Sequence, residues 1–400
     1  MKILFLNHNV KWRSTFHRCL QFGKHLVARG HEVDLLTIAP TSRTTFAESL
    51  IEGVRVVETP DLLFGIMRTG WDPYDTLRRT RYLRGRRYDL IHAFDSRPAV
   101  ILPALAQRER DGALLLTDWA DWWGRGGIID ERPNKLIKWG FGGIETYFEE
   151  HYRTRADGLT VISRALQERA IRLGVPEHAI ARISGGADVE QIKPLDRTAS
   201  REQLGVPRAV PVIGFSGFVH YDLAFLLQAF DLLARERGDV HLLLTGGSSP
   251  LVQRAAERGG WADRVITAGM VDYALLPTYL ACADVFALPF MDKQANRGRW
   301  PNKIGDYLSA GRPVVSNPTG DIQDLFARYD IGCLTPETPA AFAQGFAAVL
   351  NDPAHATEQG AAARHAAEHE LDWAKLTATL DAHYDRIRAG PAVAAHAVRR

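Results

Sequence analysis

The densest group of residues that could do chemistry runs from 299 to 315, with the sequence RWPNKIGDYLSAGRPVV. Pro301 presets the backbone for a helix start, and Gly311 provides a helix stop. The first turn of such a helix presents free N–H groups and a partial positive charge to an anion. Arg299 lies just before that turn and Lys303 lies within it. Both cations are therefore placed where a diphosphate group would bind.

A carboxylate accompanies these cations. Asp306 follows Lys303 by three residues, so the two side chains project from one helix face. A carboxylate in this place can accept two hydrogen bonds from the hydroxyls of a ribose. We therefore predict that Asn302, Lys303 and Asp306 bind a nucleotide, and that Arg299 and Lys303 also act in catalysis. The alternative is that Lys303 and Asp306 form an ordinary exposed helical pair.

Glycine turns end two predicted strands in the second half of the chain. Gly217 follows a strand at 210–215, and Gly246 follows a strand at 241–244. Glycine lets a ligand approach the backbone closely at such turns. We expect Gly217, Phe218 and Gly246 to line the nucleotide site, although a glycine after a strand can equally be only a turn.

A second group ends a predicted strand in the first half, where residues 114–124 read LLLTDWADWWG. The carboxylates of Asp118 and Asp121 could hold sugar hydroxyls or orient a reacting hydroxyl. The faces of Trp119 and Trp122 could stack on sugar rings. We predict that the two aspartates are catalytic and that the two tryptophans bind a sugar substrate. The alternative is a hydrophobic loop stabilised by packing.

The polar segment 7–18, NHNVKWRSTFHR, follows the first predicted strand. Its polar side chains suggest contact with a substrate, and we predict this role for Asn9 and for Arg18, near the start of a helix. His92 and Asp95 follow another strand and are further candidates. A structural histidine explains His92 equally well.

Short apolar runs alternate with longer helical patterns along the chain, as is typical of β–α–β units and a parallel sheet. Strands are predicted at 2–6, 32–38, 54–58, 90–92, 113–117, 158–162, 180–183, 210–215, 241–244, 264–267, 285–288, 313–315 and 331–334. Helices are predicted at 15–28, 163–173 and 372–387, and the stretch 193–200 reads as a linker. These patterns predict two doubly wound, Rossmann-like α/β domains. Ligands bind at the carboxyl ends of strands in such sheets, so we expect the working site in the cleft between the domains.

The composition limits the class of protein. A chain of 400 residues exceeds one ordinary domain, and its formal net charge of +2 gives no reason to expect nucleic acid as a partner. Cys19, Cys282 and Cys333 are too far apart in the sequence to indicate a disulfide framework or a zinc site. No apolar run approaches the roughly 20 residues of a spanning helix, and the first residues do not resemble a signal peptide. We predict a cytoplasmic protein.

Two segments could nevertheless contact the inner face of a membrane. Six arginines crowd together at 78, 79, 81, 84, 86 and 87. They form either a solvated helix face or a docking site for anionic lipid. Trp139, Phe141 and Tyr147 follow Lys135 and Lys138 in another helical segment. These aromatic residues fit contact with a membrane or a lipid-linked acceptor, and they fit core packing as well.

The stretch from Pro301 to Val315 resembles the donor-binding segment of the retaining glycosyltransferases called group 1 or family 4, which have the GT-B fold. Further segments agree with that family in order and spacing over nearly the whole chain. They are RGHEV at 29–33, VISR at 161–164, GGAD at 185–188, ADVFALP at 283–289, and LDW at 371–373 with Tyr384. The resemblance implies an acceptor domain at 1–190, whose acceptor-binding residues would include Asn9, Arg18, Trp119 and Trp122. It implies a nucleotide-sugar domain at 191–370, in which the backbone at Val271 would meet the nucleotide base. It also implies a terminal helix at 371–388 that returns to the first domain, followed by a tail at 389–400.

The chain departs from the family pattern in two places on the donor side. The family often has two glutamates seven residues apart, whereas this chain has Gly298 at the first position and Asp306 at the second. Asp292 could substitute for the missing carboxylate. The family also has an arginine and a lysine after the first strand of the second domain, and the segment 216–222 lacks both. We predict that Arg299 and Lys303 replace them.

The resemblance implies transfer of a sugar from a nucleotide-diphosphate sugar to a hydroxyl of a glycan, a lipid-linked acceptor or a small molecule. Configuration would be retained, and neither a metal nor another cofactor would be needed. Two alternatives remain open at this point. One is a non-catalytic protein that binds nucleotide sugars, which the missing motif residues favour. The other is a different GT-B enzyme, such as a nucleotide-sugar epimerase.

Overall fold

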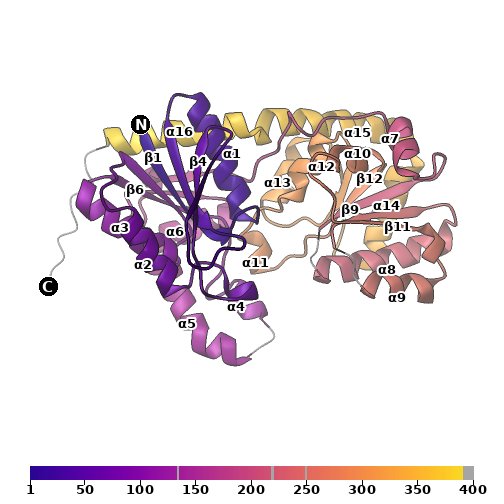
Figure 1. Cartoon of the computed structure of the whole chain (residues 1–400). Helices are drawn as coiled ribbons and strands as arrows, with labels where there is room; N and C mark the ends of the chain where they lie inside the picture. Colours follow the sequence, from indigo (N-terminus) through magenta and orange to yellow (C-terminus); the bar gives the residue numbers. More distant parts are fainter. Residues whose placement is uncertain (133–134, 218–219, 248–249, 391–400) are drawn as a thin grey trace. The chain divides into compact units, whose positions relative to one another are not determined.

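A computed structural model describes residues 1–132, 135–217, 220–247 and 250–390, and these residues form two compact units (Figure 1). The first unit contains Met1–Ser184, Arg297–Trp300 and the chain from Trp373 onward. The second contains Gly185–Asn296 and Pro301–Asp372. Each unit is built on a largely parallel sheet, which confirms the predicted α/β class with two Rossmann-like domains.

The described part of the first unit holds an eight-stranded sheet in the order β3-β4-β2-β1-β5-β6-β7-β8. All neighbouring strands are parallel except β3 and β4. The strands are β1 (Lys2–Val10), β2 (Glu32–Ile38), β3 (Ala47–Ile51), β4 (Val54–Thr59), β5 (Leu90–Phe94), β6 (Leu114–Trp119), β7 (Gly158–Val161) and β8 (Ile180–Arg182).

Strand β3 is the one strand of this sheet that the sequence patterns miss. It is an exposed edge strand with the sequence AESLI, so it lacks the apolar run of a buried strand. Glu52 and Gly53 both have positive φ, at 50° and 79°, and this pair turns the chain from β3 into β4. Two residues with positive φ suit a tight hairpin, whose twist matches that of its strands.

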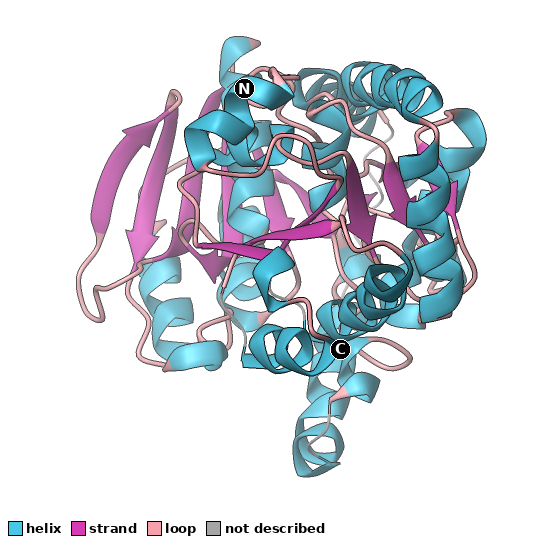
Figure 2. Ribbon diagram, turned by 90° about the vertical axis from the view of Figure 1, so that its right-hand side faces the viewer, coloured by secondary structure: helices cyan, strands magenta, loops and turns pink. Residues whose placement is uncertain are grey.

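Helices follow most strands of this unit, and the chain as a whole alternates helices with strands (Figure 2). The helices of this unit are α1 (Thr15–Ala28), α2 (Pro73–Tyr82), α3 (Pro98–Asp111), α4 (Ile128–Glu131), α5 (Lys135–His151), α6 (Arg164–Arg172) and α16 (Trp373–Ala389). Single 3₁₀ turns lie at η1 (Gly65–Met67), η2 (Arg153–Arg155) and η3 (Glu177–Ala179). Ser163 caps α6 as predicted, because its hydroxyl accepts a hydrogen bond from the N–H of Leu166. Phe22 of α1 packs edge-on against Trp373 of α16, with ring centres 5.2 Å apart.

A buried polar network lies within the first unit. Arg18 donates from Nε and Nη2 to the two carboxylate oxygens of Asp118, at 3.1 and 3.0 Å, and it also donates to the carbonyls of Ile183 and Ser184. Thr160 donates to the same carboxylate at 2.6 Å, and His92 lies 3.1 Å from the Thr160 hydroxyl. Burial opposes ionisation of Asp118, but Arg18 outweighs it and the pKa of this carboxyl lies below its ordinary value. The network therefore ties α1 to β6, β7 and the chain after β8.

Among the residues described for the second unit, six parallel strands form a sheet in the order β11-β10-β9-β12-β13-β14. Its strands are β9 (Val212–Ser216), β10 (His241–Thr245), β11 (Val265–Gly269), β12 (Val285–Leu288), β13 (Val314–Ser316) and β14 (Gly332–Leu334). Its helices are α7 (Arg197–Leu204), α8 (His220–Glu236), α9 (Pro250–Gly259), α10 (Leu276–Ala281), α12 (Lys303–Ser309), α13 (Asp321–Arg328), α14 (Pro339–Asn351) and α15 (Pro353–Ala366). Three short elements complete the list: α11 (Gln294–Arg297), the 3₁₀ turn η4 (Ala262–Arg264) and the π-helical turn η5 (Ala367–Leu371).

The stretch 193–200, expected as a linker, is helical in its second half. Asp196 accepts a hydrogen bond from the N–H of Ala199 and so caps α7, and Gly205 ends that helix at a φ of 66°. The two units separate earlier, between Ser184 and Gly185, and again between Asp372 and Trp373. The tail from 391 onward lies outside the described residues.

The Arg18–Asp118 pair gives a stability prediction. Replacing Arg18 with Met would leave a buried carboxylate without its cation, so we expect a loss of about 3–5 kcal/mol in the free energy of unfolding. Arg172→Met is the control, because Arg172 is exposed and lies 4.0 Å from Glu168, where a pair contributes roughly 0–1 kcal/mol. Urea unfolding followed by tryptophan fluorescence measures both. Equal losses in the two variants would show that the network does not hold the unit together.

Candidate functional site

Three of the residues predicted to bind a nucleotide meet at the carboxyl edge of the second sheet. Gly217 and Gly246 have φ angles of 131° and 118°, which disfavour any other residue. A Cβ on Gly246 would lie 2.9 Å from the carbonyl oxygen of Gly217, so the two turns touch. A Cβ on Gly217 would lie 3.2 Å from Nζ of Lys303. The backbone turns after β9 and β10 thus lie directly beside a lysine ammonium.

Lys303 begins α12, and the core of the unit holds this helix in place. The Tyr307 hydroxyl accepts a hydrogen bond of 2.8 Å from the N–H of Ser216, at the end of β9. The Tyr307 ring stacks on Phe286 with centres 4.0 Å apart. Nζ of Lys303 lies 4.0 Å from the centre of the Phe215 ring, a cation–π contact. These contacts fix a half-buried positive charge at the end of β9.

Two carboxyl groups accompany Lys303 in this unit. Gly305 packs so closely on the turn at 185–188 that a Cβ there would lie 2.6 Å from the carbonyl oxygen of Gly186. The helix therefore brings Asp306 near Asp188. Burial raises the pKa of Asp306 to about 7, and the charge of Asp188 adds to the effect. Asp306 therefore changes its protonation state near neutral pH.

The other residues predicted on the donor side differ in exposure and in the contacts they make. Asn302 is exposed and precedes α12, where its side chain makes no capping hydrogen bond with a described residue. Val271 is half-buried just beyond β11. Phe218 lies outside the described residues. Asp292 is exposed, and its backbone N–H donates to the carboxylate of Glu337.

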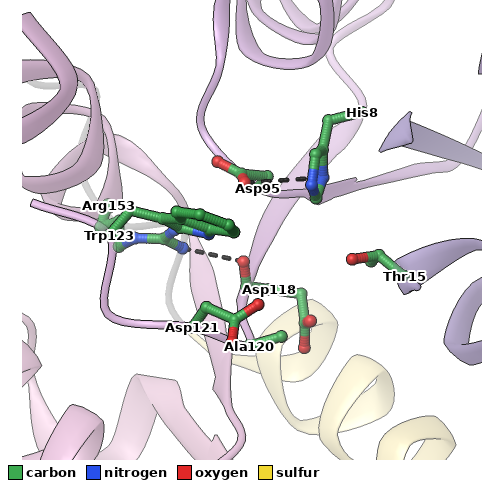
Figure 3. Close-up of a pocket in the computed structure, with 8 residues that line it drawn as sticks. All are labelled: His8, Thr15, Asp95, Asp118, Ala120, Asp121, Trp123 and Arg153. Atoms are coloured by element: carbon green, nitrogen blue, oxygen red, sulfur yellow. Dashed lines mark hydrogen bonds and ion pairs between the residues drawn. The ribbon is translucent and has the colours of Figure 1, made fainter. Parts of the chain in front are cut away.

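The first unit has a small polar pocket at the carboxyl edge of its own sheet (Figure 3). Most of its lining residues lie in or just after strands β1, β5 and β6, and the others lie at the start of α1 and in the turn η2. The lining residues are His8, Thr15, Asp95, Asp118, Ala120, Asp121, Trp123 and Arg153. This is the edge at which parallel sheets bind ligands.

His8 and Asp95 form one side of the pocket (Figure 3). Nδ1 of His8 lies 3.5 Å from the Asp95 carboxylate, and Nε2 lies 2.9 Å from the amide nitrogen of Asn9. Burial lowers the pKa of His8 to about 4, so the imidazole is neutral at pH 7. Asp95 has a φ of 100°, a strained conformation for a residue other than glycine. Asn9, predicted to bind the acceptor, therefore orients His8 and also donates to Thr15.

Asp121 supplies a carboxyl group of different character. It is half-buried just after β6, and burial raises its pKa to about 7, although the nearby guanidinium of Arg299 opposes the shift. A carboxyl group with a pKa near neutral can take up or release a proton at the pH of the cell. Arg299 belongs to the first unit, whereas Lys303 belongs to the second.

The structure corrects the predicted roles of the two tryptophans. Trp119 is fully buried, its indole N–H donates to Glu149 at 3.1 Å, and the guanidinium groups of Arg153 and Arg169 lie over its ring. Trp122 is also buried, with Arg169 at 4.2 Å from its ring centre. Both rings are buried and contact arginine, so neither is exposed to stack on a sugar.

Arg18 and Asp118 also depart from their predicted roles. Each uses its charge to neutralise the other in the network described above, and Arg18 is only 6% exposed. Asp118 reaches the pocket, but its carboxylate already accepts from Arg18 and Thr160. The surroundings of these two side chains therefore indicate a structural role in place of acceptor binding and catalysis.

Sequence reasoning missed His8, Trp123 and Arg153 as pocket residues. The predicted first strand ended at residue 6, whereas β1 continues to Val10 and so carries His8 to the sheet edge. Trp123 is the half-buried tryptophan of its loop, with the Arg97 guanidinium 4.4 Å from its ring centre. Strand ends give the signal that finds His8 and Asp95, whereas no local pattern indicates Arg153.

No helix in the described part of the chain combines the length and the apolar character that crossing a membrane requires.

Comparison with known proteins places these features in a family. A model of glycosyltransferase family 4 matches residues 17–191, and a model of glycosyl transferases group 1 matches residues 210–352. The chain is 25% identical to a D-inositol 3-phosphate glycosyltransferase of Xylanimonas cellulosilytica, over 93% of this chain and 92% of that protein. It is 26% identical to a GDP-mannose-dependent alpha-mannosyltransferase of Mycobacterium tuberculosis, over 91% and 90% of the two chains.

Solved structures agree on the fold. A sucrose-phosphate synthase from Thermosynechococcus elongatus superposes with a TM-score of 0.75 at 19% identity, over 97% of this chain and 99% of that one. The two family models follow the order of the two units along the chain. The chain therefore belongs to the group 1 and family 4 glycosyltransferases, which are enzymes of the GT-B fold.

Proposed function

We propose that this glycosyltransferase moves a hexosyl group from a nucleotide-diphosphate sugar to a hydroxyl of a sugar or lipid-linked acceptor at the inner face of a membrane. The second unit binds the nucleotide and the first unit binds the acceptor. The observation that carries this proposal is the meeting of Gly217, Gly246 and Lys303 at the edge of the second sheet. Glycines that let a ligand approach the backbone closely, next to an ammonium group, suit a diphosphate.

In this proposal Lys303 neutralises the charge that develops on the diphosphate as the sugar–phosphate bond breaks. A preorganised cation in a partly buried site stabilises such charge strongly. Transfer is proposed to need no metal, because Lys303 supplies positive charge beside the two glycine turns. A contribution of Arg299 to the same charge stays a prediction. Asp306 is proposed to accept hydrogen bonds from the ribose hydroxyls.

The acceptor is proposed to bind at the pocket of the first unit. Asp121 is the group there whose pKa, about 7, suits proton exchange with an acceptor hydroxyl. Neutral His8 can donate or accept a hydrogen bond without carrying charge. Retention of configuration is proposed from the family resemblance. The GDP-mannose named for one relative is a donor to test first.

An epimerase would also bind a nucleotide sugar, and product analysis distinguishes the two reactions. With donor and acceptor present, a transferase releases a nucleoside diphosphate and a new glycoside, whereas an epimerase returns an altered sugar without an acceptor. Proton NMR of the new anomeric centre reports retention or inversion directly. An inverted product would refute the proposed stereochemistry but not the transfer.

Replacing Lys303 with Ala should weaken nucleotide binding about 10- to 100-fold, because a charge-assisted hydrogen bond contributes roughly 1.5–3 kcal/mol. Calorimetric titration of UDP, GDP, ADP and dTDP into both proteins measures the effect. Lys193→Ala is the matched control, since Lys193 lies exposed in the same unit and pairs with Glu190. Unchanged affinity in Lys303→Ala would remove this residue from the phosphate site.

The raised pKa of Asp306 predicts a pH dependence of donor binding. Only the ionised carboxylate accepts hydrogen bonds on both oxygens, so affinity should fall as the pH drops through about 7. At pH 6 about a tenth of the carboxyl groups are ionised, and Kd should rise about tenfold over its value at pH 8.5. A nucleotide sugar is the ligand of choice, because its diphosphate does not titrate in this range. Asp306→Asn should bind more weakly and lose the pH dependence; a wild-type profile without slope would contradict the assignment.

Replacing Asp121 with Asn should lower kcat about 10²- to 10⁴-fold while leaving Kd for the nucleotide unchanged, because general base catalysis contributes on that scale. Asp130→Asn is a control in the same unit, since Asp130 is exposed and pairs with Lys138. Steady-state rates with the established donor and acceptor provide the measurement. A variant that keeps full kcat would show that another group receives the proton.

A further inference from the structure

In the segment from Asp61 to Arg87 the acidic side chains are buried, whereas most of the basic side chains are at least partly exposed. Its three aspartates, Asp61, Asp72 and Asp75, are all buried. Arg79 is buried with them and pairs with Asp75 at 2.9 Å. The exposed or half-exposed charges of this segment are Arg68, Arg78, Arg81, Arg84, Arg86 and Arg87. The outer surface of this segment is therefore positive, although the net charge of the whole chain is only +2.

Large apolar side chains lie exposed in the same segment. Phe64 is 72% exposed and Met67 is 55% exposed, both in the loop and the 3₁₀ turn η1 before α2. Leu62 and Leu77 are exposed to 44% and 45%. Single exposed apolar residues are ordinary, but four within sixteen residues form a cluster that requires an explanation.

Hydrogen bonds hold this loop in a defined shape. The Asp72 carboxylate accepts from the N–H of Leu62 at 2.5 Å and also from Tyr74 at 2.9 Å, so it joins the loop to the first turn of α2. Arg43 donates to the carbonyl of Leu63 at 2.6 Å and stacks over the Phe64 ring at 4.3 Å. Arg68 donates to the carbonyl of Ala39 at 2.5 Å. These hydrogen bonds fix the conformation of the loop that carries the exposed apolar side chains.

Helix α2 continues the surface with positive charge. Leu77 and Arg81 are four residues apart in α2 and so share one helical face, and Arg84 follows in the turn just after the helix; all three are exposed. Within the described part of the chain, neither Arg81 nor Arg84 forms an ion pair. By contrast, Arg86 lies 3.7 Å from Glu48. The two arginines are thus available to an external anion.

We propose that Leu62, Phe64, Met67, Leu77, Arg81 and Arg84 form a docking surface for an anionic lipid bilayer. The apolar side chains enter the interface between headgroups and acyl chains, and the arginines contact lipid phosphates. This pairing of apolar and basic side chains favours lipid over nucleic acid, whose backbone offers phosphates but no apolar layer. Docking at this surface uses none of the residues assigned to sugar transfer, so it stands or falls independently of the proposed reaction.

Helix α5 is the competing membrane contact, because Trp139 is 88% exposed there. Trp71, just before α2, packs against Phe141 of this helix with ring centres 4.5 Å apart, so α5 adjoins the docking surface (Figure 1). Its charge pattern is different, since Lys138 is neutralised by Asp130 at 2.7 Å. The observations favour the loop and α2, and Trp139→Ser tests the alternative.

The experiment is co-sedimentation of the full chain with vesicles of phosphatidylcholine alone or with about one third phosphatidylglycerol. Wild type should bind the anionic vesicles and not the neutral ones. Phe64→Ser with Met67→Ser should weaken this binding about tenfold or more, and so should Arg81→Glu with Arg84→Glu. Arg254→Glu with Arg258→Glu is the control, because these exposed arginines of α9 carry the same charge change outside the docking surface. Circular dichroism establishes that each variant is folded.

Three results would overturn the proposal. One is wild-type protein that does not bind anionic vesicles. Another is an equal loss in the α9 control, which would reduce the effect to net charge. The third is a loss with Trp139→Ser while both docking-surface variants still bind, which would move the contact to α5. Vesicle binding is measured without donor or acceptor, so a failure of sugar transfer would leave the result unaffected.

Discussion

The buried pair of Arg18 and Asp118 is the constraint on which the first unit depends. A carboxylate at the end of β6 can be buried only with its cation, and Arg18 meets this need while also binding the carbonyls of Ile183 and Ser184. The backbone of Asp118 takes part as well, because its carbonyl accepts from Arg153 at 2.9 Å and from the N–H of Asp95 at 3.3 Å. The groups that position the walls of the pocket are thus already engaged in hydrogen bonds and an ion pair with one another. This leaves Asp121, three residues later, as the carboxyl group whose surroundings suit chemistry.

The second unit prepares its site in a different way. It brings together two glycine turns, one half-buried lysine and a helix that Tyr307 and Gly305 fix by contact. The pKa of Asp306 is raised because burial and Asp188 both disfavour its charge, so the ligand-free site is electrostatically unfavourable for a carboxylate. In the proposed function, ribose hydroxyls relieve part of that cost by donating hydrogen bonds to this carboxylate.

The parts of the structure that depend on local backbone preference could be predicted from the sequence. Alternating apolar runs identify nearly all the strands, and Gly217 and Gly246 stand where positive φ is required. The edge strand β3 could not be found, because exposed AESLI has no burial pattern. The environment of individual side chains could not be predicted from the sequence either. Asp118 and Asp121 look alike in the sequence, and only the fold shows that one is neutralised by Arg18 while the other is not. The same holds for Trp119, whose faces are covered by arginines from η2 and α6.

Arginine has two separate uses in the first unit, and this explains why composition alone says little about partners. Arg18, Arg79 and Arg153 are buried and neutralise carboxylates or bind carbonyls, so their charge never reaches the surface. Arg81 and Arg84 lie outward beside exposed apolar side chains. The net charge of +2 counts buried and exposed arginines alike. Asp61, Asp72 and Asp75 are buried, where they hold a loop, cap a helix and pair with Arg68 and Arg79. Arg81 and Arg84 of the same segment therefore keep their charge for a partner outside the protein.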